Sequence, residues 1–228
     1  MRLLQSIGLM ILLVTAFSSS ARAQRASSAR NDPLHDSQIW PDTQVSIGIR
    51  PNLFLVISGT ARLGRDDYSA FVNEQVGVGL TRRLGRSFTT GFQYRYINSE
   101  PTPDRQSREH RLHVELAARA PLKWGVDISN RVRVERRDIN RAISWRYRNR
   151  LQFERPFSIH EHRFIPYVSG EPYYDTRFQR WSRVQVFVGS RIPISKHVTF
   201  DGFYMRQFDA RVRPGFLHVV GIYWRVEI

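Results

Sequence analysis

The sequence NRVRVERR at residues 130–137 decides the fold class, together with WRYRNRLQFE at residues 145–154. In the first stretch Arg131, Arg133, Glu135 and Arg137 share one parity while Val132 and Val134 lie on the other, and in the second the even positions are polar and the odd ones, apart from Asn149, are apolar or aromatic. A period of two is the spacing of a β-strand, whereas a helix repeats every 3.6 residues. Residues 108–118 follow the same pattern. The sequence therefore predicts three strands that each have a charged face and an apolar face.

Such two-faced strands fit a soluble β-sandwich or a membrane β-barrel, and the N-terminus favours the barrel. It contains Arg2, an apolar run at residues 7–17 and the motif Ala21-Arg22-Ala23, the three parts of a secretory signal peptide. The apolar run is about half as long as the ~20 residues that a membrane-spanning helix needs. We expect export to the outer membrane of a Gram-negative bacterium, where a barrel turns its apolar face to lipid and keeps charged residues inside.

The predicted fold class is all-β, a transmembrane antiparallel up-and-down β-barrel of about 10–12 strands behind a cleaved signal peptide. We assign residues 1–23 to the signal peptide, 24–38 to a flexible N-terminal arm and 39–228 to the outer-membrane barrel. Eleven candidate strands can be counted, near residues 40–49, 53–62, 71–83, 88–97, 108–118, 124–136, 145–155, 163–173, 181–191, 198–206 and 216–227. Bacterial single-chain barrels have even strand numbers, so we expect ten or twelve strands in preference to eleven. With an odd count the first strand would begin at the external end, unless the arm threads the lumen.

Short and long polar connections alternate between these strands. The short ones lie near residues 50–52, 84–87, 121–123 and 194–196, with 156–162 somewhat longer; the long ones span 64–70, 98–107, 138–144, 174–180 and 207–215. Short turns face the periplasm in outer-membrane barrels, so we expect the same here. Tryptophans near the strand ends should form interfacial belts: Trp40, Trp124, Trp145, Trp181 and Trp224.

The composition is strongly basic, with a formal net charge of +15 and a sequence pI near 11.1. Such a charge often indicates nucleic-acid binding. Here the basic residues, nearly all arginine, alternate with apolar residues along strands, and export removes most nucleic-acid partners. We expect the partners to be outer-membrane lipid, lipopolysaccharide and the barrel assembly machinery, with small anions as a further alternative. The absence of cysteine excludes a disulfide framework.

Several segments carry a family resemblance. They are Glu109-His110-Arg111 at the opening of a strand, the alternating runs at 131–137 and 146–150, and the segment 202–207 ahead of a final strand with His218. In these segments, the chain resembles the family of the domain of unknown function numbered 2490, whose members are predicted outer-membrane β-barrels. The resemblance covers residues 40 to 228. It implies fold and location, and it implies no reaction, cofactor or binding residue.

Charged residues gather on the polar faces of three candidate strands, whose rows adjoin if the strands are neighbours. We name this set the charge ladder: Glu109, Arg111, His113, Glu115, Arg131, Arg133, Glu135, Arg137, Arg146, Arg148, Arg150 and Glu154. One interpretation is an ion-pair network that fills and stiffens the barrel, because pairing offsets the cost of burying charges. The other is a basic constriction that favours anions, since the arginines outnumber the glutamates.

An enzyme would need a serine or aspartate beside an activating histidine. The candidates are His160 and His162, which flank Glu161 in a predicted turn, and His197 near Asp201. A metal pair at His160 and His162 would lack a third ligand, so we expect neither a metal nor a cofactor. We interpret the chain as a non-enzymatic outer-membrane barrel of unspecified role with an Arg/Glu-lined lumen. A small anion-permeable pore and a lipid-modifying barrel enzyme are the alternatives.

Overall fold

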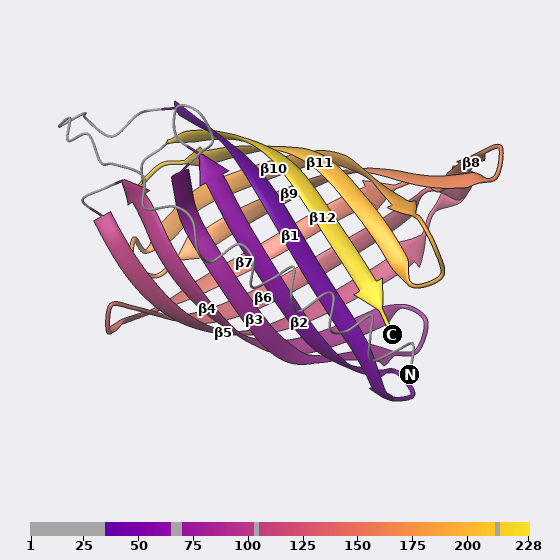
Figure 1. The fold of residues 1–228 in the computed structure, drawn as a ribbon, viewed down its shortest axis with the longest axis horizontal. Helices are drawn as coiled ribbons and strands as arrows, with labels where there is room; N and C mark the ends of the chain where they lie inside the picture. Colours follow the sequence, from indigo (N-terminus) through magenta and orange to yellow (C-terminus); the bar gives the residue numbers. More distant parts are fainter. Residues whose placement is uncertain (1–34, 65–69, 103–104, 213–214) are drawn as a thin grey trace. The chain divides into compact units, whose positions relative to one another are not determined.

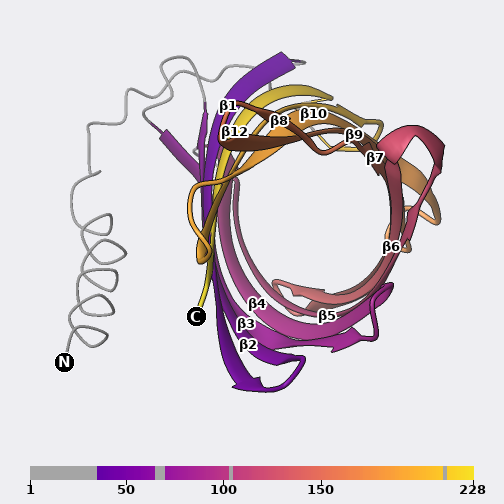
Figure 2. The ribbon, with the colours of Figure 1, turned by 90° about the vertical axis from the view of Figure 1, so that its right-hand side faces the viewer.

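The computed structural model describes residues 35–64, 70–102, 105–212 and 215–228, so the expected signal peptide lies outside the described residues. The described residues form one closed sheet, whose strands Figure 2 shows arranged in a ring. The wall strands are β1 His35–Arg50, β2 Leu53–Gly64, β3 Ala70–Leu84, β4 Phe88–Thr102, β5 Arg105–Pro121, β6 Asp127–Ile139, β7 Ala142–Glu154, β9 His162–Asp175, β10 Arg180–Pro193, β11 Val198–Asp209 and β12 Phe216–Glu227. The short strand β8, Phe157–Ile159, pairs with the start of β9 in a hairpin that projects beyond the wall (Figure 1).

The wall contains eleven strands within the described ranges, so the preference for ten or twelve was wrong. The barrel closes by pairing β1 with β12 in parallel, from His35 opposite Phe216 to Ser46 opposite Glu227. Every other pair of wall neighbours is antiparallel. A closed barrel with an odd number of strands must contain one parallel pair when all its other neighbouring strands are antiparallel. The parallel pair also means that the first and last strands begin at the same end, here called the His35 end, and finish at the Ile228 end.

The strands extend further than the sequence pattern suggested. β6 ends at Ile139 and β7 begins at Ala142, so the expected long link at 138–144 is a two-residue turn. Its residues, Asn140 and Arg141, have φ values of 50° and 73°, the positive values that tight hairpin turns adopt. The wall strands contain 12 to 17 residues, more than the ~9–11 that cross a bilayer. Each wall strand is therefore long enough to cross a bilayer.

The start of the barrel also differs from expectation. β1 begins at His35, so residues 35–38 belong to the wall and not to the flexible arm assigned to 24–38, whose other residues lie outside the described part. The prediction that Trp40 belongs to an interfacial belt was wrong. Its position on β1 points the side chain into the lumen, where it is 9% exposed. The other four tryptophans are 41–85% exposed.

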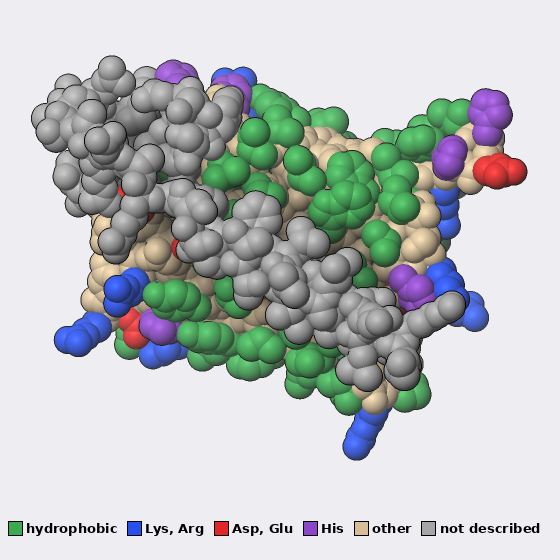
Figure 3. All heavy atoms as spheres, viewed as in Figure 1, with side chains coloured by type: hydrophobic (Ala, Val, Ile, Leu, Met, Phe, Trp, Pro, Cys, Tyr) green, Lys and Arg blue, Asp and Glu red, His purple; other side chains and the backbone are tan. Residues whose placement is uncertain are grey.

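Large apolar side chains cover the outside of the barrel. In the described part of the chain, 33 of them are exposed. Figure 3 shows such side chains across the middle of the visible face, with arginine and lysine toward its two ends. Strand alternation produces this arrangement: Val184, Val186 and Val188 of β10 face outward, while Gln185 and Phe187 between them are buried inside. No helix in the described ranges is long and apolar enough to cross a membrane.

The inside contains an apolar cluster on one part of the wall. Its residues are Trp40, Tyr167, Phe187, Met205, Leu217 and Val219, with Phe203 packed against them. We call this cluster, which lies mainly on the inner face of β1 and β10–β12, the apolar wall. The ring of Phe203 covers Gly221, where any side chain would collide with it. A glycine at this position therefore lets an aromatic ring lie directly on the neighbouring strand.

Candidate functional site

A cavity of about 690 Å³ occupies the lumen. Its lining reaches from Ser99 and Arg177 near the His35 end to Thr81 and Gln152 near the Ile228 end. Among the described lining residues are four carboxylates, Asp42, Glu109, Glu115 and Asp201, and thirteen arginines, Arg62, Arg95, Arg111, Arg131, Arg133, Arg137, Arg146, Arg148, Arg150, Arg177, Arg183, Arg191 and Arg225. The surface that faces the cavity is therefore strongly basic.

The charge ladder lies on three neighbouring strands. β5 pairs with β6, and β6 pairs with β7, so Glu115 lies opposite Arg133, and Glu135 lies opposite Arg146. All twelve residues share the inward parity of their strands, and ten of them line the cavity. Glu135 and Glu154 lie behind that lining and are 0% and 4% exposed. The structure thus brings the three rows together on one side of the lumen, which we call the charged wall.

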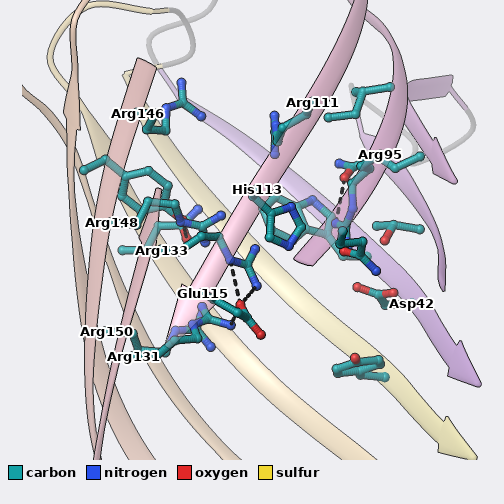
Figure 4. A pocket seen from close by; sticks show the side chains of 18 of the residues that line it. Asp42, Arg95, Arg111, His113, Glu115, Arg131, Arg133, Arg146, Arg148 and Arg150 are labelled. Atoms are coloured by element: carbon teal, nitrogen blue, oxygen red, sulfur yellow. Dashed lines mark hydrogen bonds and ion pairs between the residues drawn. The ribbon is translucent and has the colours of Figure 1, made fainter. Parts of the chain in front are cut away.

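Within the ladder, single carboxylates bind more than one arginine. Glu109 Oε1 accepts hydrogen bonds from the Nε atoms of Arg111 and Arg137, both at 2.7 Å. Glu115 Oε2 accepts two bonds from Arg133, which Figure 4 shows as dashed lines. Hydrogen bonds between two charged groups of this kind are about twice as strong as neutral ones. The ladder is therefore a connected network and not a set of separate pairs.

The sequence analysis missed the central acid of this network, Glu171 on β9. Its side chain is 0% exposed and lies 3.0 Å from Arg131, 3.0 Å from Arg148 and 2.6 Å from Arg150. The strand order explains the contact, because β9 is the next neighbour of β7 in the wall. Glu171 therefore joins arginines from β6 and β7, and β9 completes the charged wall as its fourth strand.

A second missed acid, Asp175 at the end of β9, is also 0% exposed. One of its carboxylate oxygens lies 2.9 Å from Arg137, 2.8 Å from Arg146 and 2.8 Å from Arg177. The signal that would have found both acids was present in the sequence. Ser169, Glu171 and Asp175 share one parity of β9, in the same charged-and-apolar alternation that identified the ladder.

This sharing determines what the wall offers to a ligand. A charged group buried alone costs several kcal/mol, so the buried acids require arginine partners and hold those arginines in place. Because each acid is shared by two or three arginines, positive charge remains in excess on the cavity side. The arrangement is suited to attract anions and to exclude cations.

Two further arginines, Arg62 on β2 and Arg95 on β4, line the cavity outside the charged wall, without an ion-pair partner among the described residues. Arg95 donates only to neutral acceptors on Gln75, Gln93 and Ser58. Neither strand carries a ladder residue, and the sequence analysis did not single out either arginine.

The histidines considered for catalysis or metal binding lie away from this cavity. His160 and His162 are exposed in the hairpin turn between β8 and β9. His197 is exposed at the Ile228 end, with its Nδ1 atom 2.8 Å from the backbone oxygen of Glu227. A search of the described ranges finds no group of three or more potential metal ligands. The structure therefore brings none of these residues together as a catalytic or metal site.

The family suggested by the sequence motifs can be tested by comparison with known proteins. The chain belongs to the DUF2490 family. The model of this family, described as "Protein of unknown function (DUF2490)", matches residues 37–214 and confirms the resemblance. Among solved structures, LpxR from Salmonella typhimurium is similar with a TM-score of 0.48 and 10% identity, over 77% of this chain and 83% of that chain. No curated protein matches the sequence.

Proposed function

We propose that the protein is a non-enzymatic β-barrel of the outer membrane whose lumen conducts small anions. The observation that carries this proposal is the cavity, because its lining reaches toward both ends of the barrel and bears thirteen arginines against four carboxylates. A ring of fixed positive charge lowers the energy of an anion in a pore and raises that of a cation. A lumen that served only as filling would not need to leave such a cavity beside its ion pairs.

The exterior supports the location in a membrane. An exposed apolar surface of this extent would cause a protein in water to aggregate. Exposed tryptophans mark both ends of the band, with Trp145 and Trp181 toward the His35 end and Trp124 and Trp224 toward the Ile228 end. Aromatic rings at two levels fit the two headgroup regions of a bilayer. The closed wall also leaves no unpaired strand edge in the lipid.

The ion-pair network of the charged wall explains how a lumen with so many long arginine side chains can stay open to ions. Arg148 is held by Glu135 and Glu171, at 2.9 Å and 3.0 Å, both of which are buried in the wall behind the cavity. Its guanidinium also lies over the ring of Tyr173, 4.4 Å from the ring centroid. Contacts of this kind hold the arginine along the wall, so that its charge faces the cavity without its side chain having to cross it.

Conductance of the refolded mature chain in a planar bilayer tests the proposal. Under a KCl gradient, the reversal potential should have the sign of an anion-selective pore. Arg133→Gln and Arg148→Gln should each shift it toward cations, because each removes one positive charge from the lining. Arg206→Gln is the matched control, since Arg206 is exposed on the outward face of β11. Folded protein that conducts no ions, or a selectivity that neither lumen variant alters, would contradict the proposal.

A further inference from the structure

Arg62 and Arg95 differ from every arginine of the charged wall in their partners. Ladder arginines have carboxylates at hydrogen-bonding distance, as between Arg150 and Glu171 at 2.6 Å. Arg95 instead donates to Gln75 and Gln93 at 3.1 Å each, and to Ser58 at 3.4 Å. Three neutral acceptors at these distances leave its positive charge unbalanced.

Arg62 has still fewer partners. Its guanidinium lies over the ring of Trp40, with Cζ 3.9 Å from the centroid, and it donates to no carboxylate among the described residues. The ring fixes the plane of the guanidinium by stacking but satisfies none of its N–H groups. The Nε atoms of Arg62, Arg95, Arg131, Arg191 and Arg225 are buried without a hydrogen-bond partner in the described part of the chain. Arg131, Arg191 and Arg225 each have a carboxylate partner through another nitrogen, whereas Arg62 and Arg95 have none among the described residues. These two guanidinium groups in one lumen thus combine unused donors with an unpaired charge.

Like charges converge on this part of the lumen from several strands. Arg95 lies directly opposite Arg111 on β5 in the strand register. Arg62, Arg95, Arg111 and Arg183, which come from β2, β4, β5 and β10, all line the same cavity. Asp42 of β1 lines the same cavity but forms no ion pair with Arg62 or Arg95. Figure 4 shows Arg95, Arg111 and Asp42 around the same space. An anion placed there would relieve the repulsion between the arginines.

We propose that Arg62 and Arg95, together with Arg111, form a binding site for a tetrahedral oxyanion of the phosphate or sulfate class. A guanidinium matches such an anion by two parallel N–H···O bonds, and two such groups can contact different edges of one tetrahedron. The inference rests on the proposed function, because the site lies in the lumen of the proposed channel. It assigns that channel a preferred class of anion.

Calorimetric titration of inorganic phosphate into the refolded mature chain in detergent micelles measures the site directly. Wild-type protein should bind about one phosphate. The double variant Arg62→Gln, Arg95→Gln should bind it at least about tenfold more weakly, since it loses charge-assisted hydrogen bonds. The control is Arg225→Gln, because Arg225 also lines the cavity but is paired with Asp201 at 2.7 Å. Equal weakening in the control, or no binding to the wild type, would overturn the site.

The geometry of recognition can be tested apart from the charge. Arg95→Lys retains the positive charge but loses the planar pair of donors, so phosphate binding should weaken while chloride binding should not. This variant also serves if the double variant does not fold. Glycerol 3-phosphate and sulfate are compared with phosphate to establish whether the site takes free oxyanions or a phosphoryl group on a larger molecule; preference for chloride over all three would overturn the proposal.

Bilayer recordings separate this inference from the proposed function. Phosphate added to a chloride-conducting channel should reduce the chloride current, and less so in the double variant. Phosphate binding in micelles without any conductance would disprove the channel but retain the site. Chloride conductance that phosphate leaves unchanged, with no binding in micelles, would disprove the site but retain the channel.

Discussion

Ion pairs fill most of the inner face of β5, β6, β7 and β9, whereas the inner face of β1 and β10–β12 carries the apolar cluster beside separate ion pairs such as that of Arg225 with Asp201. Both walls belong to one barrel and alternate with the same strand period. On the charged wall the fully buried residues include Glu135 and Glu171; on the apolar wall they include Met205 and Val219. The same lumen is thus lined in two physically different ways.

The difference shows how a barrel can be both rigid and basic. Apolar packing is non-directional and leaves no charge, so the apolar wall can stabilise the barrel but cannot select an ion. The ion pairs are directional and hold arginines at defined positions along the cavity. The two walls meet where Arg150 lies over the ring of Phe187, 4.1 Å from its centroid. Selectivity and stability can therefore be tested separately by substitutions on each wall.

The largest effect is expected on the charged wall, from Glu171→Gln. This change keeps the shape of the side chain but removes the charge shared by Arg131, Arg148 and Arg150. Uncompensated buried charges cost about 3–5 kcal/mol, so the free energy of unfolding should fall by that amount. Urea unfolding of the refolded barrel, followed by tryptophan fluorescence, measures it. Glu161→Gln in the exposed β8–β9 turn is the control, and an equal loss in both variants would show that the network is not the source of stability.

On the apolar wall, Met205→Ala should have the next largest effect. Met205 is 0% exposed and belongs to the cluster around Phe187 and Leu217. Its truncation leaves a cavity and should lower the free energy of unfolding by about 2–3 kcal/mol. Anion selectivity in bilayers should not change, because no charge is lost. Met205→Leu, which nearly conserves volume, should cost less than about 1.5 kcal/mol; a change of selectivity in either variant would contradict the separation of the two walls.

The architecture of the charged wall could be predicted from sequence because its signal is local. Alternation along β5, β6 and β7 gives the face of each ladder residue without knowledge of any partner. The same local signal was available for Glu171 on β9, but its aromatic neighbours Tyr173 and Tyr174 weaken the alternation. Whether Glu171 would meet Arg131, two strands away, depends on register and barrel curvature, which no single segment contains.

The seam and the apolar wall could not be predicted in this way. The strand count depends on how His35 pairs with Phe216, a contact between distant parts of the sequence. A tryptophan near a strand end looks the same in the sequence whether it faces the lumen or the lipid. For Trp40, the β1–β12 register decides that the side chain faces the lumen. The unpaired state of Arg62 and Arg95 is likewise a property of what lies opposite them in three dimensions.

The smallest loss of stability is expected when the exposed ion pair of Arg83 and Glu227, at the Ile228 end, is removed. This pair allows an exposed ion pair to be compared with the buried ones of the charged wall. The two side chains are 49% and 50% exposed and 2.8 Å apart, so their geometry resembles that of the ladder while their surroundings do not. Water screens an exposed pair, and Arg83→Gln should lower the free energy of unfolding by less than about 1 kcal/mol. Urea unfolding at low and high salt measures this. A loss as large as that of Glu171→Gln would mean that geometry, and not burial, governs the strength of the ion pairs in this barrel.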